Sequence, residues 1–177
     1  MTTYDSGGPF GTSIDAKTLR NTLGSFGSGV IVVTAAGAEP HGMTCQSFAS
    51  LSLEPPLVMF APSRNSQSWP RIRESGTLGI NILASDQQWI SDQFARSGTE
   101  KFTGIRWKPS PLGAPILDGV TAWLECTIVD ELDGGDHTIV IGRVNSVKSH
   151  TQRAPLLFHR GQYLRTERDA ELRVIVP

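Results

Sequence analysis

Short apolar runs rich in β-branched residues recur along the chain, and glycine or proline bounds most of them. Such runs are typical of buried strands. The runs are residues 30–35, 57–61, 77–83, 120–129, 137–147, 156–158 and 162–164. Two hairpins are predicted, one through Asp133-Gly134-Gly135 and one through Gly161. Because connections this short exclude parallel crossovers, the pattern predicts an antiparallel sheet.

Helical spacing is found at fewer places. Near the N-terminus, Ser13 is the expected N-cap of a helix, and the apolar face of that helix consists of Leu19, Leu23 and Phe26. A short helix is expected from Asn65 or Ser66 through Ile72. Residues 85–88 have the spacing of a capping box and predict the start of a third helix. The side chains that this helix is expected to bury are Trp89, Ile90 and Phe94.

Two segments have neither the apolar run of a buried strand nor the spacing of a helix. Residues 43–53 are polar and are expected to be extended, and residues 97–118 are expected to form a long irregular loop. The fold class that follows is mainly β, an antiparallel β-barrel with a few covering α-helices. One domain is expected at residues 13–165, between a flexible arm (1–12) and a C-terminal tail (166–177) that can pack on a partner subunit.

Composition and charge exclude several classes of protein. The 177 residues include 16 Lys and Arg against 17 Asp and Glu, and no five basic residues are consecutive, so we expect no nucleic-acid partner. No apolar run has a length of about 20 residues, so no membrane span is expected. The first residues do not resemble a secretory signal. Cys45 and Cys126 form no CxxC motif, which favours reduced thiols in a cytoplasmic protein.

The familiar catalytic motifs are missing from the sequence. Residues 24–29 are rich in glycine, but they follow a predicted helix and precede a strand, whereas a dinucleotide fingerprint follows a strand and begins a helix. The four histidines have no zinc-ligand spacing, so no metal is expected. No serine lies in a GxSxG elbow, and no pair of carboxylates has a recognisable glycosidase spacing. We therefore expect no catalytic side chain of the usual kind.

Residues 42–53 have an unusual content of small polar side chains. On a single strand, Thr44, Gln46, Ser50 and Ser52 would project from the same face. One interpretation is an edge strand that faces solvent. The other is a platform of hydroxyls, amides and backbone N–H groups for a flat ligand rich in nitrogen and oxygen.

An ordered set of motifs resembles the short flavin reductase family, the reductase components of two-component flavin-dependent monooxygenases. The motifs are residues 23–35, 40–44, 47–58, 81–87, 101–104, 123–126, 135–139, 155–157 and 161–163. The resemblance runs from about residue 19 to residue 163. It implies a Greek-key split β-barrel, a homodimer, reduction of FMN or FAD by NADH or NADPH, and a monooxygenase partner that accepts the reduced flavin.

The resemblance also implies roles for individual residues. The isoalloxazine ring and the ribityl chain are expected at Thr44, Gln46, Ser47 and Ser50, with Ser52 at the end of that motif. The flavin phosphate is expected near Asn65 and Ser66, and a second flavin contact at Lys101 and Phe102. The nicotinamide is expected beside His137 and Tyr163. Many family members have asparagine where this chain has Gln46.

This chemistry explains why no catalytic motif is found. Hydride passes between the two cofactors, so the protein has only to hold two rings in contact and exclude water. Two other functions fit the same residues: a barrel that holds FMN tightly and acts on a small substrate, or a flavin carrier without activity. The sequence itself does not distinguish FMN from FAD, nor NADH from NADPH.

Overall fold

The computed structural model describes residues 14–98, 100–150 and 152–165. The expected arm (1–12), the predicted cap Ser13 and the tail (166–177) lie outside the described residues. The helices are α1 (Ala16–Leu23), α2 (Trp69–Glu74) and α3 (Gln88–Ala95). The first six strands are β1 (Ser28–Gly29), β2 (Ile31–Ala35), β3 (His41–Cys45), β4 (Ala49–Leu53), β5 (Pro56–Phe60) and β6 (Thr77–Ile82). The remaining strands are β7 (Trp107–Pro109), β8 (Pro115–Leu117), β9 (Ala122–Gly134), β10 (His137–Ser149), β11 (Leu156–His159) and β12 (Gln162–Arg165).

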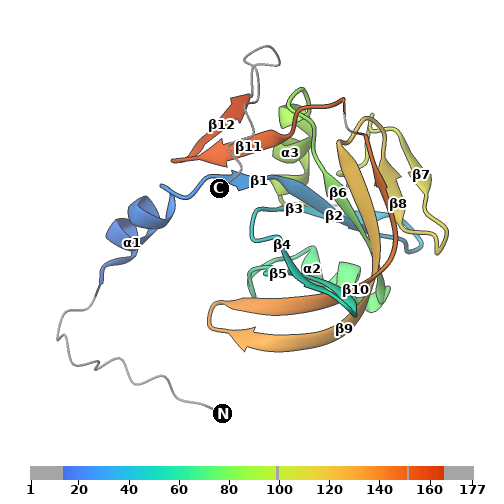
Figure 1. Cartoon of the computed structure of the whole chain (residues 1–177), viewed down its shortest axis with the longest axis horizontal. Coiled ribbons are helices and arrows are strands. Elements are labelled where there is room, and N and C mark those ends of the chain that lie inside the picture. The colour runs from blue at the N-terminus through green and yellow to red at the C-terminus, as the bar shows by residue number, and fades with distance from the viewer. Residues whose placement is uncertain (1–13, 99, 151, 166–177) are drawn as a thin grey trace.

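Seven strands form one antiparallel sheet in the order β3-β2-β6-β9-β10-β5-β4 (Figure 1). This confirms a mainly β protein with few helices. Strands β3 and β4 are the two edges of this sheet, so the described strands do not close into a barrel. A smaller sheet has the order β1-β11-β12. The helices of the described ranges are too short and too polar to span a bilayer.

The two predicted hairpins are confirmed. The β9–β10 hairpin turns at Gly135-Asp136, where Gly135 has a φ of +79° that glycine adopts without strain. The β11–β12 hairpin turns at Arg160 and Gly161, which both have positive φ, as a type I′ turn requires. The segment predicted to be an irregular loop differs from expectation, because it contains the β7–β8 pair.

Strand β2 lies at the centre of the core, and its five residues are all buried. Ile31 and Val33 pack in one hydrophobic cluster with Trp69 and Ile72 of α2. Val32 points the other way, into a second cluster that includes Ile90 and Phe94 of α3. Both faces of the strand are therefore covered, which explains an unbroken apolar run where a half-exposed strand would alternate.

The helix boundaries depart from the sequence prediction. Asp15 is the N-cap of α1, and its carboxylate accepts hydrogen bonds from the N–H groups of Lys17 and Thr18, both at 3.0 Å. A side-chain hydrogen bond from Thr18, and then these backbone bonds, hold the pKa of Asp15 below its ordinary value. In Figure 1, α1 lies outside the seven-stranded sheet, and none of its residues is buried.

The predicted capping box of α3 does not form. The N-cap position is Gln87, and its side chain makes no cap bond. Gln87 Oε1 instead accepts a hydrogen bond from the N–H of Ala84 at 2.9 Å, and Nε2 donates to the carbonyl of Asp118 at 2.8 Å. Ile90 and Phe94 are buried as predicted, whereas the prediction for Trp89 was wrong, since 52% of its surface is exposed.

Candidate functional site

An open cleft of about 600 Å³ lies beside the C-terminal end of β3. Its walls are the loop after β3, the loop of residues 61–68 after β5, the residues around the C-terminal end of α3, the start of β10, and the β11–β12 hairpin. The lining is a mixture of polar groups and a few aromatic rings. Such a mixture is typical of pockets that orient a flat polar ligand.

Most of the predicted site residues line this cleft, although they come from five separate parts of the sequence. They are Thr44, Gln46, Ser47, Asn65, Ser66, Lys101, His137 and Tyr163. The cleft therefore places the residues assigned to flavin and the residues assigned to nicotinamide in one cavity. The individual roles of these residues stay predictions.

Ser50 and Ser52 do not line the cleft. The segment predicted as one extended strand is two strands, β3 and β4, which lie at opposite edges of the sheet. Ser50 is exposed and pairs with Val58 of β5. The prediction of a single polar face was therefore wrong, because the chain turns at residues 46–48, between the two strands.

Phe102 is also absent from the cleft lining. Its ring packs against Phe94 in an edge-on arrangement with the ring centres 4.9 Å apart, and against Trp107 at 6.0 Å. Phe102 thus anchors the segment after α3 to the core. This packing supports the neighbouring Lys101, which does line the cleft.

The two predicted hydroxyls at the end of β3 and in the loop after it are bound to the protein itself. Thr44 Oγ1 donates to the carbonyl of Ser91 at 2.7 Å, which ties β3 to α3. Ser47 Oγ accepts from the N–H of Ala61 at 2.7 Å and donates to its carbonyl at 3.1 Å, which ties the loop after β3 to the end of β5. These side chains shape the cleft. The exposed side-chain amide of Gln46 also lines the cleft and has no side-chain hydrogen bond within the described residues.

Lys101 is a buried cation at the edge of the cleft, with 8% of its surface exposed. Its Nζ donates to the carbonyls of Gly42 (3.3 Å) and Phe94 (3.0 Å) and to Ser68 Oγ (2.8 Å). Burial lowers the pKa of Lys101. The three donors of the ammonium are used within the protein, so Lys101 contributes charge to the cleft rather than a free hydrogen bond.

His137 is the first residue of β10 and faces the cleft from the tip of the long hairpin. Its Nδ1 lies 2.7 Å from Asp136 Oδ1. This hydrogen bond, and then the charge of the histidine, hold the pKa of the Asp136 carboxyl below its ordinary value. Because Nδ1 faces the carboxylate, Nε2 is the nitrogen available to a ligand.

Arg64 fixes the hairpin tip against the loop after β5. Its guanidinium lies 2.7 Å from Asp133 Oδ1, and its backbone N–H donates to the carbonyl of Asp136 at 3.0 Å. Thr138 donates its N–H to the carbonyl of Pro62, also at 3.0 Å. The loop that contains Asn65 and the hairpin tip next to His137 are therefore held together.

Tyr163 of β12 lines the cleft from the β11–β12 hairpin. Its hydroxyl lies 2.9 Å from Ser91 Oγ, and its ring packs edge-on against Phe158 with the centres 5.1 Å apart. Burial raises the pKa of Tyr163, and the nearby Asp92 adds to the rise. The phenol therefore stays protonated at neutral pH and can donate a hydrogen bond.

Other residues line the cleft that the sequence did not assign. They include Ser63, Gln67, Ser68, Arg96 and Phe158. The unbroken polar run of residues 63–68 after a strand was a usable signal, because a loop with so many hydrogen-bonding groups is typical of a binding loop. Nothing local marks Phe158, whose position depends on how the β11–β12 hairpin packs.

A second groove adjoins the cleft at Gln46, His137 and Phe158. It runs between α1 and the β11–β12 turn and has a volume of about 1150 Å³. No cluster of three or more metal-ligating side chains is found within the described ranges. The buried thiol of Cys126 takes no part in either cavity, and burial raises its pKa to about 12, with the charge of Glu125 adding to the rise.

The cleft, its polar loops and its half-buried histidine are typical of a site for a flat polar ligand. Comparison with known proteins identifies the class. A model described as the flavin reductase like domain matches residues 23–167, so the chain belongs to this family. This confirms the resemblance found in the sequence.

Relatives and solved structures agree with this membership. The chain is 46% identical over 158 residues to the reductase subunit of a flavin-dependent monooxygenase from Rhodococcus jostii, covering 89% of this chain and 81% of the relative. It is 39% identical over 155 residues to an FMN reductase (NADH) from Agrobacterium fabrum, covering 87% of this chain and 88% of the relative. An NADH:FAD oxidoreductase from Streptomyces globisporus, solved with NAD and FAD fragments, matches with a TM-score of 0.84 at 35% identity, covering 90% of this chain and 99% of that one.

Proposed function

We propose that this chain is an NAD(P)H:flavin oxidoreductase that reduces FMN or FAD and supplies the reduced flavin to a separate monooxygenase. The observation that carries the proposal is the shared cleft, in which the loop with Asn65 and Ser66 faces the hairpin tip with His137. Membership of the flavin reductase like domain family supports the same activity. The relative from Rhodococcus jostii, a reductase subunit of a monooxygenase, supports the partner.

The residues of the cleft have positioning roles in this reaction. When both substrates are bound, hydride passes from the nicotinamide ring to the flavin ring. Gln46 and the backbone after β3 orient the flavin, and the loop of residues 63–68 binds its polar chain. His137 Nε2 and the Tyr163 hydroxyl face the same space and orient the nicotinamide. The packed aromatic pair of Phe158 and Tyr163 excludes water from that side of the cleft.

A kinetic assay tests the activity directly. Purified protein should consume NADH or NADPH rapidly only when free FMN or FAD is added. If neither nicotinamide is consumed at saturating flavin, the proposal is wrong. Flavin that stays bound through desalting, with turnover that needs no added flavin, would instead indicate a prosthetic group and a direct organic substrate.

His137 is the residue that separates a reductase from a flavin carrier. His137→Ala should raise the apparent KM for the nicotinamide by about tenfold, the cost of one lost hydrogen bond in a bound complex, and change the KM for flavin less than twofold. Asp136→Asn, which keeps the imidazole but weakens its orientation, should have a smaller effect in the same direction. A larger change in the flavin KM than in the nicotinamide KM would reject this assignment.

The same proposal includes a homodimer with a split-barrel arrangement of the sheet. Leu23 and Phe26 are 63% and 82% exposed in this chain, although they belong to the apolar face of α1 and the turn that follows it. Large exposed apolar side chains that line a groove together are typical of a protein–protein interface. A second copy on this surface would cover the groove that adjoins His137.

The domain limits (residues 13–165) and the cytoplasmic setting stay predictions.

A further inference from the structure

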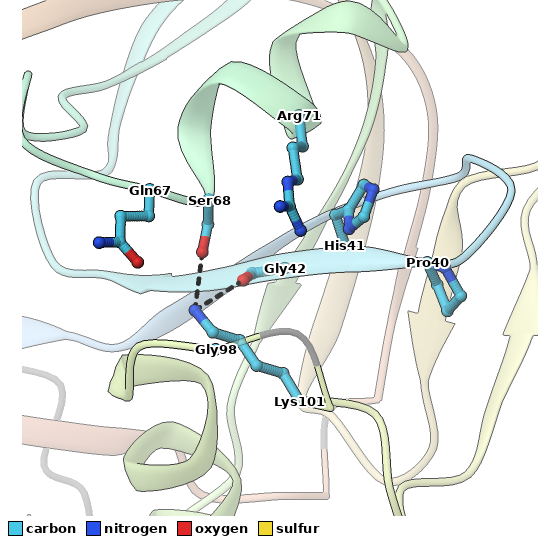
Figure 2. Close-up of a pocket in the computed structure, with 8 residues that line it drawn as sticks. All are labelled: Pro40, His41, Gly42, Gln67, Ser68, Arg71, Gly98 and Lys101. Carbon is cyan, nitrogen blue, oxygen red and sulfur yellow. Dashed lines mark hydrogen bonds between the residues drawn. The ribbon is translucent and has the colours of Figure 1, made fainter.

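A small basic pocket opens beside the cleft, between β3, the start of α2 and the residues after α3 (Figure 2). Its volume is about 70 Å³. By the scale of about 10–15 Å³ for one enclosed water, this space holds about five to seven water-sized groups, which is enough for a phosphate. It is too small for a purine ring. The lining residues are Pro40, His41, Gly42, Gln67, Ser68, Arg71, Gly98 and Lys101.

The floor of this pocket is positively charged. Lys101 is buried there, and its Nζ is held by the carbonyl of Gly42 and the hydroxyl of Ser68 (Figure 2). Within the described residues, no carboxylate lies within ion-pair distance of Lys101. A buried charge without a counterion makes the pocket attractive to an anion.

Arg71 and His41 supply free donors at the rim. The guanidinium of Arg71 and the ring of His41 lie side by side in Figure 2, and no side-chain hydrogen bond or ion pair is recorded for either within the described residues. Arg73, on the same helix, is different, because its Nε lies 2.7 Å from Glu131. No acidic side chain lines the pocket in the described part of the chain. Free arginine donors around a buried cation suit the geometry of a phosphate.

The position of the pocket relates it to the flavin. Asn65 and Ser66, the residues expected near the first flavin phosphate, line the cleft. The next residues, Gln67 and Ser68, line both the cleft and the basic pocket. The two cavities therefore adjoin, and a ligand whose first phosphate lies at Asn65 and Ser66 has a place for a second phosphate in the basic pocket. FMN has one phosphate, whereas FAD has two.

We propose that the basic pocket binds the second phosphate of FAD, the one attached to adenosine, and that Arg71 makes the enzyme prefer FAD to FMN. This inference rests on the proposed function of the cleft. Lys101 contributes charge from below, and the guanidinium of Arg71 donates hydrogen bonds directly. The adenosine then lies outside the small pocket, on the surface past Arg71.

The test compares Arg71→Gln with wild type in steady-state assays at saturating NADH, with FMN and FAD as alternative substrates. Arg71→Gln should raise the KM for FAD about tenfold, as expected for a lost charge-assisted hydrogen bond, and leave the KM for FMN within about twofold. Arg73→Gln is the matched control, because it removes the same charge from the same helix at a residue that pairs with Glu131. This control should leave the ratio of the KM for FAD to the KM for FMN unchanged.

Three results would overturn the proposal. If Arg71→Gln raises the KM for FMN and the KM for FAD equally, the pocket binds the first phosphate. If it changes neither KM, the pocket has no role in flavin binding. An increase confined to the KM for NADPH, in assays that compare it with NADH, would assign the pocket to the 2′-phosphate. If wild type oxidises no nicotinamide, the proposed function itself fails. Equilibrium titration of FAD and FMN against both variants then still tests the pocket.

Discussion

The hydroxyl of Ser47 shows how one residue can shape the cleft without facing the ligand. It exchanges two hydrogen bonds with the backbone of Ala61. We expect Ser47→Ala to lower the free energy of unfolding by about 1 kcal/mol and to weaken flavin binding, because the loop after β3 loses its attachment to β5. Urea denaturation and flavin titration measure the two effects.

Ser50→Ala is the control for this prediction. Ser50 is exposed on β4, does not line the cleft, and makes no side-chain hydrogen bond within the described residues. We expect the substitution to change neither stability nor flavin affinity. A loss of flavin binding in Ser50→Ala with none in Ser47→Ala would restore the sequence-based assignment of Ser50 to the site.

Residue types were easier to predict than residue partners. The unusual polar content of residues 42–53 indicated a binding segment, and the family resemblance supplied the other predicted residues that line the cleft. The sequence could not show that Thr44 bonds to Ser91 or that Lys101 uses its three donors on the protein. Those partners come from segments between about 7 and 59 residues away along the chain.

At the scale of elements, Gly42 permits the close contact between β3 and α3. A Cβ at this position would lie 2.4 Å and 2.7 Å from two ring atoms of Phe94, a side chain that is 1% exposed. We expect Gly42→Ala to lower the free energy of unfolding by about 2 kcal/mol, because the buried ring cannot move away without strain. The midpoint of urea denaturation measures this change.

Gly29→Ala is the matched control for Gly42. Gly29 also lies in a strand, and a Cβ there would meet nothing within 4 Å. This variant should have nearly the stability of wild type. Since Lys101 donates to the carbonyl of Gly42, the first variant should also weaken flavin binding, whereas stability equal to that of Gly29→Ala would contradict the packing argument.

Strands and hairpins were predicted well, and helix ends poorly. Glycine at a two-residue turn specifies a hairpin locally, which explains the β9–β10 and β11–β12 turns. Helix caps depend on competition between neighbouring side chains. Asp15 caps α1, and Gln87 bonds to Asp118 instead of supporting a capping box at the start of α3.

For the whole molecule, the sequence predicted the class of fold but not the order of the strands. Strands β3 and β4 are separated by only three residues in the chain, yet five other strands lie between them in the hydrogen-bonded order of the sheet. Local patterns report the burial of each strand and not its neighbours. The predicted single polar strand at residues 43–53 failed for this reason.

The exposed apolar face of α1 leads to a prediction about the oligomeric state. Leu23 is 63% exposed and lines the groove that adjoins the cleft at His137. If a second copy covers this face, Leu23→Asp should shift the protein from dimer to monomer in analytical ultracentrifugation, because a carboxylate would be buried in the interface. Leu112→Asp is the control, since Leu112 is similarly exposed (58%) but lies outside that groove. Because the groove contains His137, the monomer should also have a higher KM for the nicotinamide than the dimer. A wild-type monomer with full activity would contradict the homodimer.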